Sequence, residues 1–169
     1  MEGVNRSIVY FNQSAIENTD DVVEIVYQRL KEGDIKSVVV ASTSGFVGLQ
    51  FARKMARETN LVIVTSQYEP LDPEKRKELE SMGCKVVRHS HILSGVDRSI
   101  SRKYSGVSHV EFLAESLRCL FGCGMKVAVE CSIMAADSDA IPVEKTIAVG
   151  GSGSARGRGA DCAAVVWPS

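Results

Sequence analysis

Short apolar runs alternate with helical patterns in the first half of the chain, and this alternation limits the fold more than any other feature. Residues 37–41 and 61–65 have the β-branched composition of buried strands, and a less apolar run follows at 84–88. Helical patterns at 46–58 and 73–82 separate them. Connections this short require right-handed crossovers, so we expect an α/β domain with a parallel sheet.

The segments around these runs extend the pattern. Residues 8–11 predict a short N-terminal strand, and a helix that begins near Thr19 is expected to end before Gly33. Residues 89–107 are polar with little periodicity, which predicts an ordered excursion with one short turn. Ser108 then begins a helix, and Glu111 completes a capping box.

The C-terminal part is less regular. Residues 125–136 fit a strand or a helix equally well, whereas 146–149 and 162–167 predict two strands. The link between those strands has no helical pattern, so we expect the last strand to run antiparallel to its neighbour. Because the chain stops directly after a strand, we expect a C-terminal tail in a longer native protein.

Length and composition indicate one cytoplasmic domain over residues 1–169. Hydrophobic residues make up 44% of the 169, and the net charge is −1, so no overall field would attract nucleic acid or an anionic membrane. No apolar run reaches the length of a membrane span. The five cysteines are odd in number and no signal peptide precedes them, which favours reduced thiols inside the cell.

Ser42, Thr43, Ser44 and Gly45 form the first candidate site. They leave a buried strand and open a helix, so their hydroxyls and the free N–H groups of the helix predict an anion site. The alternative is a turn whose hydroxyls only cap the helix. We expect a side chain at Gly45 to block phosphate while leaving the fold nearly intact.

A glycine-rich loop forms the second candidate site. Consecutive glycines permit N–H nests, and arginines add phosphate-binding forks, although a simple hairpin loop is the alternative. No P-loop or dinucleotide fingerprint is present. Both loops are expected at the carboxyl edge of the sheet, where ligands of such folds bind. The candidate residues of this loop are Gly151, Ser152, Gly153, Arg156, Arg158 and Gly159.

Other reactive residues give weaker signals. His89 and His91 lack a third metal ligand at suitable spacing, so no metal site is predicted. Cys119 and Cys123 have no partner pair, which favours plain thiols. No catalytic triad follows from spacing, and catalytic residues stay unknown.

Two loop motifs resemble a known family. Residues 39–45 (VVASTSG) resemble the phosphate-binding loop of the pyruvate kinase C-terminal domain. Residues 147–151 (IAVGG), leading to 159–161 (GAD), resemble a small, largely archaeal stand-alone family with that fold. Other stretches that are similar to this family are 17–20, 93–100, 126–130 and 134–137.

The resemblance implies a three-layer α/β/α sandwich with strand order 3-2-1-4-5, the fifth strand antiparallel, and a helix at 125–137. It also implies flavin mononucleotide (FMN) as cofactor, with its phosphate at Ser42–Gly45, Gly151, Ser152, Gly153 and Asp161. Asn18, Thr65, Ser66 and His91 lie on segments that could line the same crevice. The catalytic barrel of pyruvate kinase is absent from this sequence, so no kinase activity is expected.

The sequence departs from the family pattern in one place. Extra residues around Ser154, Ala155 and Arg156 lengthen the glycine-rich loop, so either Arg156 or Arg158 could take the family's arginine position.

Three functions remain open at this stage. The first is a flavoprotein enzyme, for which His91 is the one modest proton donor. The second is a regulatory or sensor module that binds a sugar phosphate or nucleotide without redox activity. The third is an interaction domain whose crevice is vestigial and which forms a stable homo-oligomer; helices in such domains often pair.

Overall fold

A five-stranded sheet forms the centre of the molecule. The computed structural model describes residues 7–12, 16–68, 71–90, 92, 96–151 and 163–167. The strand order is β3-β2-β1-β4-β5, and the first four of these strands run parallel. The last strand pairs antiparallel with its neighbour, from Gly150 opposite Ala163 to Thr146 opposite Trp167. The strands are β1 (Ser37–Ala41), β2 (Asn60–Ser66), β3 (Lys85–His89), β4 (Thr146–Gly150) and β5 (Ala163–Trp167).

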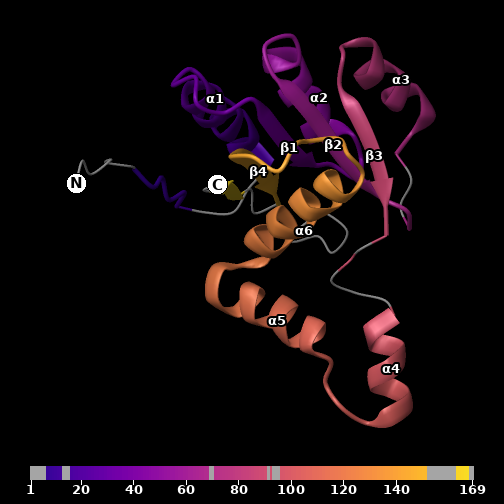
Figure 1. Ribbon diagram of the computed structural model, residues 1–169. Helices are drawn as coiled ribbons and strands as arrows, with labels where there is room; N and C mark the ends of the chain where they lie inside the picture. Colours follow the sequence, from indigo (N-terminus) through magenta and orange to yellow (C-terminus); the bar gives the residue numbers. More distant parts are fainter. Residues whose placement is uncertain are drawn as a thin grey trace.

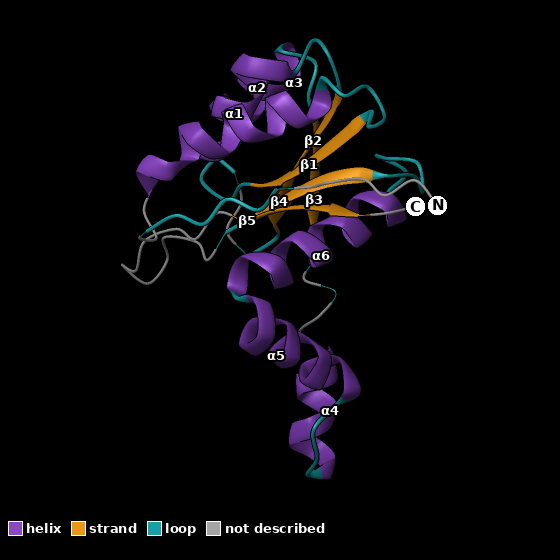
Figure 2. Ribbon diagram, turned by 90° about the vertical axis from the view of Figure 1, so that its left-hand side faces the viewer, coloured by secondary structure: helices purple, strands orange, loops and turns teal. Residues whose placement is uncertain are grey.

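Helices cover both faces of the sheet (Figures 1 and 2). A 3₁₀ turn (Ile16–Asn18), α1 (Thr19–Leu30), α2 (Phe46–Met55) and α3 (Pro73–Ser81) belong to one side. The long helix α6 (Cys123–Asp137) covers the other. The prediction of an α/β fold with a parallel sheet flanked by helices is confirmed.

The strand β1 is buried on both faces, which explains its unbroken apolar sequence. Val38 and Val40 belong to the core cluster under α1 and α2, whereas Val39 belongs to the cluster under α6. None of these three side chains is exposed to solvent. Alternate side chains of a strand point to opposite faces, so a strand covered on both sides needs apolar residues at every position.

Two helices extend from the body of the molecule (Figure 1). They are α4 (Val96–Tyr104) and α5 (His109–Phe121), and α5 packs on α6. The Ser108 hydroxyl accepts the N–H of Glu111 at 3.1 Å, which is half of the predicted capping box. The Glu111 carboxylate instead accepts the Ser101 hydroxyl at 2.9 Å, and Ser101 in turn accepts the Ser108 N–H. This chain of bonds ties α4 to the start of α5.

Two expectations are changed by the structure. The predicted strand at residues 8–11 is wrong, because residues 7–12 form no strand and Tyr10 is 84% exposed. The excursion at 89–107 contains a nine-residue helix, α4, instead of a short turn. Its apolar residues Val96, Ile100 and Tyr104 recur every four positions in an otherwise polar stretch, which gives only a weak pattern. The ambiguous segment at 125–136 is helical, as part of α6. Among the described helices, none is long and apolar enough to cross a membrane.

The end of β4 lies directly against the backbone of α6. A Cβ added to Gly150 would fall 2.6 Å from the Ala128 nitrogen and still closer to the Gly124 carbonyl oxygen. Only a glycine permits this approach, because backbone atoms on a helix cannot move aside as a flexible side chain can. The contact therefore sets the distance between α6 and the sheet.

We expect Gly150→Ala to lower the free energy of unfolding by about 1–3 kcal/mol or more, because the added methyl overpacks this contact. Thermal or denaturant unfolding measures the loss. Gly106→Ala is the matched control, since a Cβ there meets nothing within 4 Å. Equal stability of the two variants would contradict the close packing of β4 on α6.

Candidate functional site

The candidate site is the carboxyl edge of the sheet, where four loops leave the parallel strands. Ser42 follows β1 and its N–H donates to the Val64 carbonyl of β2 at 3.0 Å. Gln67 follows β2 and donates to the His89 carbonyl of β3 at 3.1 Å. These bonds continue the ladder beyond the strands, so the loops start from defined positions.

Four helices begin at this same edge. The helices α2 and α3 follow the carboxyl ends of β1 and β2, and α1 begins here because it runs back to the amino end of β1. The first turn of α6 lies against Gly150 at the end of β4. Each helix start carries a partial positive charge and N–H groups without helical partners, so this edge favours an anion.

Ser42 has a structural role inside the first candidate loop. Its side chain is buried, and its hydroxyl oxygen accepts the N–H of Gly48 at 3.0 Å. The Leu49 N–H makes an ordinary helical bond to the Gly45 carbonyl. Of the first α2 amides, Phe46 makes only a long 3.4 Å contact with the Ser44 hydroxyl, so this end of the helix remains open to an external acceptor. Thr43 and Ser44 are exposed beside it.

Gly45 does not face the ligand side in the way the sequence analysis expects. Its φ angle is +82°, and an added Cβ would lie 2.7 Å from Leu71 Cδ1 and 3.0 Å from Lys75 Cδ. A side chain at this position would therefore meet the segment that leads into α3. The expectation that the fold would tolerate such a side chain is wrong.

Two cations that the sequence analysis did not single out reach this edge. Lys75 Nζ, from the first turn of α3, donates to the Ser44 carbonyl at 2.9 Å. Arg88 Nη2, near the end of β3, donates to the Gln67 carbonyl at 3.1 Å. A basic residue in the first turn of a helix is unfavourable to the helix dipole. The position of Lys75 at the start of α3 is therefore the sequence feature that could have indicated a role for it at this edge.

Thr65 carries a buried hydroxyl without a partner. The residue is 3% exposed, and its Oγ1 is the buried side-chain atom without a hydrogen bond among the residues that the structure describes. It lies two positions beyond Ile63, which packs against α2 at Gly48, and therefore lies on the same face near the start of α2. An unsatisfied buried hydroxyl costs about 1–3 kcal/mol of stability. An apolar side chain such as valine would pack in the same strand position without this cost.

The remaining predicted residues divide into two groups. Ser66 is half-buried and accepts the Tyr68 N–H at 3.1 Å, Asn18 precedes α1, and Gly151 follows β4. The structure thus brings Asn18, Ser42–Gly45, Thr65, Ser66 and Gly151 to one edge. The other predicted residues lie outside the described part of the chain: His91, Ser152, Gly153, Arg156, Arg158, Gly159 and Asp161.

Two exposed aromatic residues lie on segments at this edge. Phe46, the first residue of α2, is 43% exposed, and Tyr68, just after β2, is 65% exposed. Aromatic side chains offer flat faces on which planar rings stack. The edge therefore combines cations and helix starts with exposed aromatic surface.

The buried thiols are not nucleophiles. Burial raises the pKa of Cys84 to about 11 and that of Cys131 to about 12, so both thiols stay protonated near neutral pH. Cys119 is exposed, but its hydrogen bond to the Glu115 carboxylate raises its pKa. No group of three His, Cys, Asp or Glu side chains within the described ranges lies close enough to hold a metal ion.

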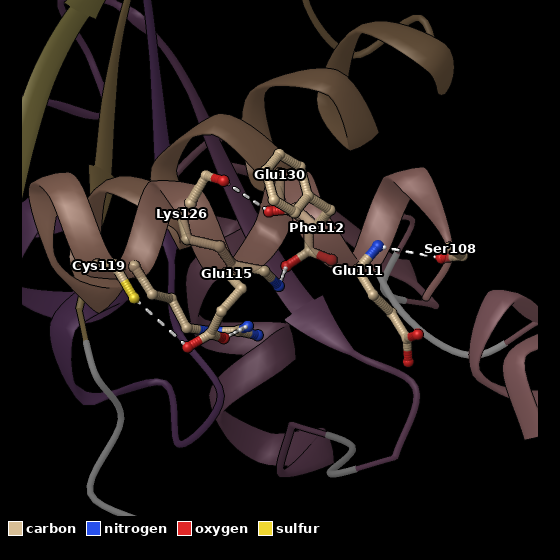
Figure 3. A network of polar contacts seen from close by, with 9 residues as sticks. Ser108, Glu111, Phe112, Glu115, Cys119, Lys126 and Glu130 are labelled. Atoms are coloured by element: carbon tan, nitrogen blue, oxygen red, sulfur yellow. Dashed lines mark hydrogen bonds and ion pairs between the residues drawn. The ribbon is translucent and has the colours of Figure 1, made fainter. Parts of the chain in front are cut away.

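A buried ion pair lies between α5 and α6 (Figure 3). Lys126 Nζ pairs with the Glu130 carboxylate one helical turn later, and both side chains are almost completely buried. Such a pair is costly to break, because removal of one partner leaves an uncompensated charge. We assign it to the packing of α6.

Comparisons with known proteins add little to this picture. No protein-family model matches the chain. The chain is similar in part to O-ureido-L-serine synthase, at 21% identity over 56% of this chain and 31% of that one, with a TM-score of 0.34. It is also similar to a mutant of such a synthase with O-ureido-L-serine bound, at 15% identity over 74% and 48% of the two chains and a TM-score of 0.35.

A hydrogen sulfide-producing enzyme from Fusobacterium nucleatum matches at 16% identity over 79% of this chain and 53% of that one, with a TM-score of 0.34. The chain spans about a third to a half of the length of these enzymes. Likenesses at this level carry no argument about function.

Two of the glycines with positive φ, Gly33 and Gly45, give a matched test of the Gly45 contact. Gly33 has a φ of +81° with nothing within 4 Å of an added Cβ, so Gly33→Ala should cost only the backbone strain of about 1–2 kcal/mol. We expect Gly45→Ala to cost about 1–3 kcal/mol more, because the methyl also meets Leu71. Urea unfolding of both variants measures the difference. Equal losses would show that the loop moves away from α3 freely.

The two buried hydroxyls should respond in opposite ways to removal. Ser42→Ala deletes the acceptor of the Gly48 N–H and should lower the free energy of unfolding by about 1 kcal/mol. Thr65→Val deletes a hydroxyl without a partner, so we expect unchanged or higher stability in the absence of ligand. Differential scanning calorimetry of the two variants decides the point. A loss from Thr65→Val as large as that from Ser42→Ala would mean that this hydroxyl is satisfied in solution.

Proposed function

We propose that the chain binds a phosphorylated small molecule, with FMN as the leading ligand, at the carboxyl edge of its sheet. The observation that carries the proposal is the loop Ser42–Gly45, which opens α2 under the Lys75 ammonium group. A phosphate at this loop would accept hydrogen bonds from the N–H groups at the start of α2. It would also replace the Ser44 carbonyl as the hydrogen-bond partner of Lys75.

The residues present fit a phosphate. The loop offers N–H groups and a nearby cation, and the unpartnered Thr65 hydroxyl lies near the start of α2. Charge-assisted hydrogen bonds contribute roughly 1.5–3 kcal/mol each, so three of them would outweigh an association cost of at least about 4 kcal/mol. Micromolar affinity is the expected range.

The exposed aromatic rings favour a ligand with a planar ring over a simple sugar phosphate. Phe46 at the start of α2 and Tyr68 just after β2 are exposed, and either could stack on an isoalloxazine or a nucleobase. A bound flavin would supply redox chemistry at this edge. The second candidate function is a sensor module that binds a sugar phosphate or nucleotide without redox activity. Its ligand would make the same phosphate contacts and would differ from FMN in the group that lies over the rings of Phe46 and Tyr68.

A fluorescence titration with FMN and riboflavin in parallel tests the proposal. We expect quenching of FMN at micromolar protein, and much weaker binding of riboflavin because it lacks the phosphate. Lys75→Met should weaken FMN binding about tenfold, or about 1.4 kcal/mol, and leave riboflavin unchanged. The control is Lys77→Met, which removes the same charge from an exposed position of α3.

Two results would contradict the proposal or redirect it. Equal binding of FMN and riboflavin, unaffected by Lys75→Met, would refute the phosphate site. Absence of flavin binding together with binding of a sugar phosphate or nucleotide would favour the sensor module. Oxidation of reduced nicotinamide by the FMN-loaded protein would then separate an enzyme from a binding protein.

A further inference from the structure

The helix α5 carries a second apolar surface that its own chain does not cover. On a helical projection, five residues share one side of α5, which we call the outer stripe: His109, Phe112, Leu113, Ser116 and Leu120. Phe112 is 68% exposed, Leu113 50% and Leu120 72%. Isolated exposed apolar residues are common, but three large ones in one stripe indicate an interaction surface.

The opposite side of α5 already has its packing partner. Ala114 is buried, and α5 contacts α6 along its length and α4 at one end. Figures 1 and 2 both show α4 and α5 extending from the body of the molecule, with α6 between α5 and the sheet. The outer stripe therefore faces away from the core, and the fold of one chain does not explain its composition.

Several polar groups on and beside the outer stripe have partners within the chain. The Ser116 hydroxyl donates to the Phe112 carbonyl at 2.8 Å. Arg118 pairs with Glu115 at 3.0 Å, and Glu111 accepts the Ser101 hydroxyl. The stripe itself contains no Asp, Glu, Lys or Arg. Aromatic enrichment with depletion of charge is the composition of an interface core.

The exposed area is suited to a modest homodimer. The three large side chains together expose roughly 350–400 Å². Since an interface core is about 65% apolar, this corresponds to roughly 600 Å² per partner, or about 1,200 Å² in total. That value is at the lower end of specific protein interfaces.

We propose that the outer stripe of α5 binds the same stripe of a second copy of this chain, forming a two-fold symmetric dimer. A two-fold interface requires a surface that is complementary to itself. The stripe meets this condition, because small Ser116 lies midway between Phe112 and Leu120 and lets two helices cross closely at that point. The large side chains of each copy then pack on either side of the crossing. The proposal is independent of any ligand at the carboxyl edge, because no residue of the outer stripe belongs to that candidate site.

Sedimentation velocity of the full chain, from about 1 to 100 µM, tests the dimer. We expect the mass of two chains at the upper end of this range. Leu120→Glu and Phe112→Glu should each weaken dimerisation at least about 100-fold, because each would bury an unpaired carboxylate from both copies in an apolar interface. Val143→Glu is the control, since Val143 is 96% exposed outside α4 and α5.

A measurement without substitutions guards against variants that fail to fold. Amide hydrogen exchange of the unmodified chain should slow in residues 109–121 as its concentration rises, with no such change in α3. A monomeric mass at 100 µM would overturn the proposal. The outer stripe would then be a binding surface for a different protein or for a lipid surface. A dimer that persists in folded Leu120→Glu, with exchange in residues 109–121 unchanged, would overturn it as well.

Discussion

The parallel ladder that joins β1 to β2 on one side and to β4 on the other determines where every other part of the molecule lies. Its register places Val39 beside Val62 and Ala148, three residues without exposed surface. Because all these strands point the same way, their loops leave at one edge, and the helices that return the chain begin there too. The chemistry of the edge is thus a consequence of strand direction, and no single loop has to create it.

Charge at this edge is supplied locally, in a molecule with almost no net charge. Lys75 donates to a carbonyl of the loop after β1, and Arg88 donates to a carbonyl of the loop after β2. These bonds hold the cations in place at little cost, since a carbonyl is a weaker partner than a phosphate. The two cations are therefore held at the edge without a bound anion. An anion at this edge could replace a loop carbonyl as the hydrogen-bond acceptor of either cation.

Sequence patterns predicted the parts of the fold that depend on local periodicity. The buried runs at 37–41 and 61–65 and the cap at Ser108 are of this kind. The patterns failed where the outcome depends on distant partners. Residues 8–11 have strand composition, but a strand exists only when a neighbour pairs with it. Gly45 illustrates the same limit within the site, since nothing near it in sequence reveals that Leu71 occupies the space beside its α-carbon. Lys75 was missed for the same reason, because its partner lies 31 residues away.

The contact of Lys75 and Leu71 with the loop after β1 has a consequence for modularity. A strand, its loop and the following helix look like a portable unit, and residues 37–55 contain all three. Here the loop is closed from outside that unit, by a lysine and a leucine that arrive only after β2 has been laid beside β1. Transplanted alone onto another sheet, the loop would lose its ammonium group and the surface that holds Gly45 in its left-handed conformation. The smallest transferable piece therefore runs through α3, and a divergent relative could abolish the site through changes in α3 while its serine-rich loop remained intact.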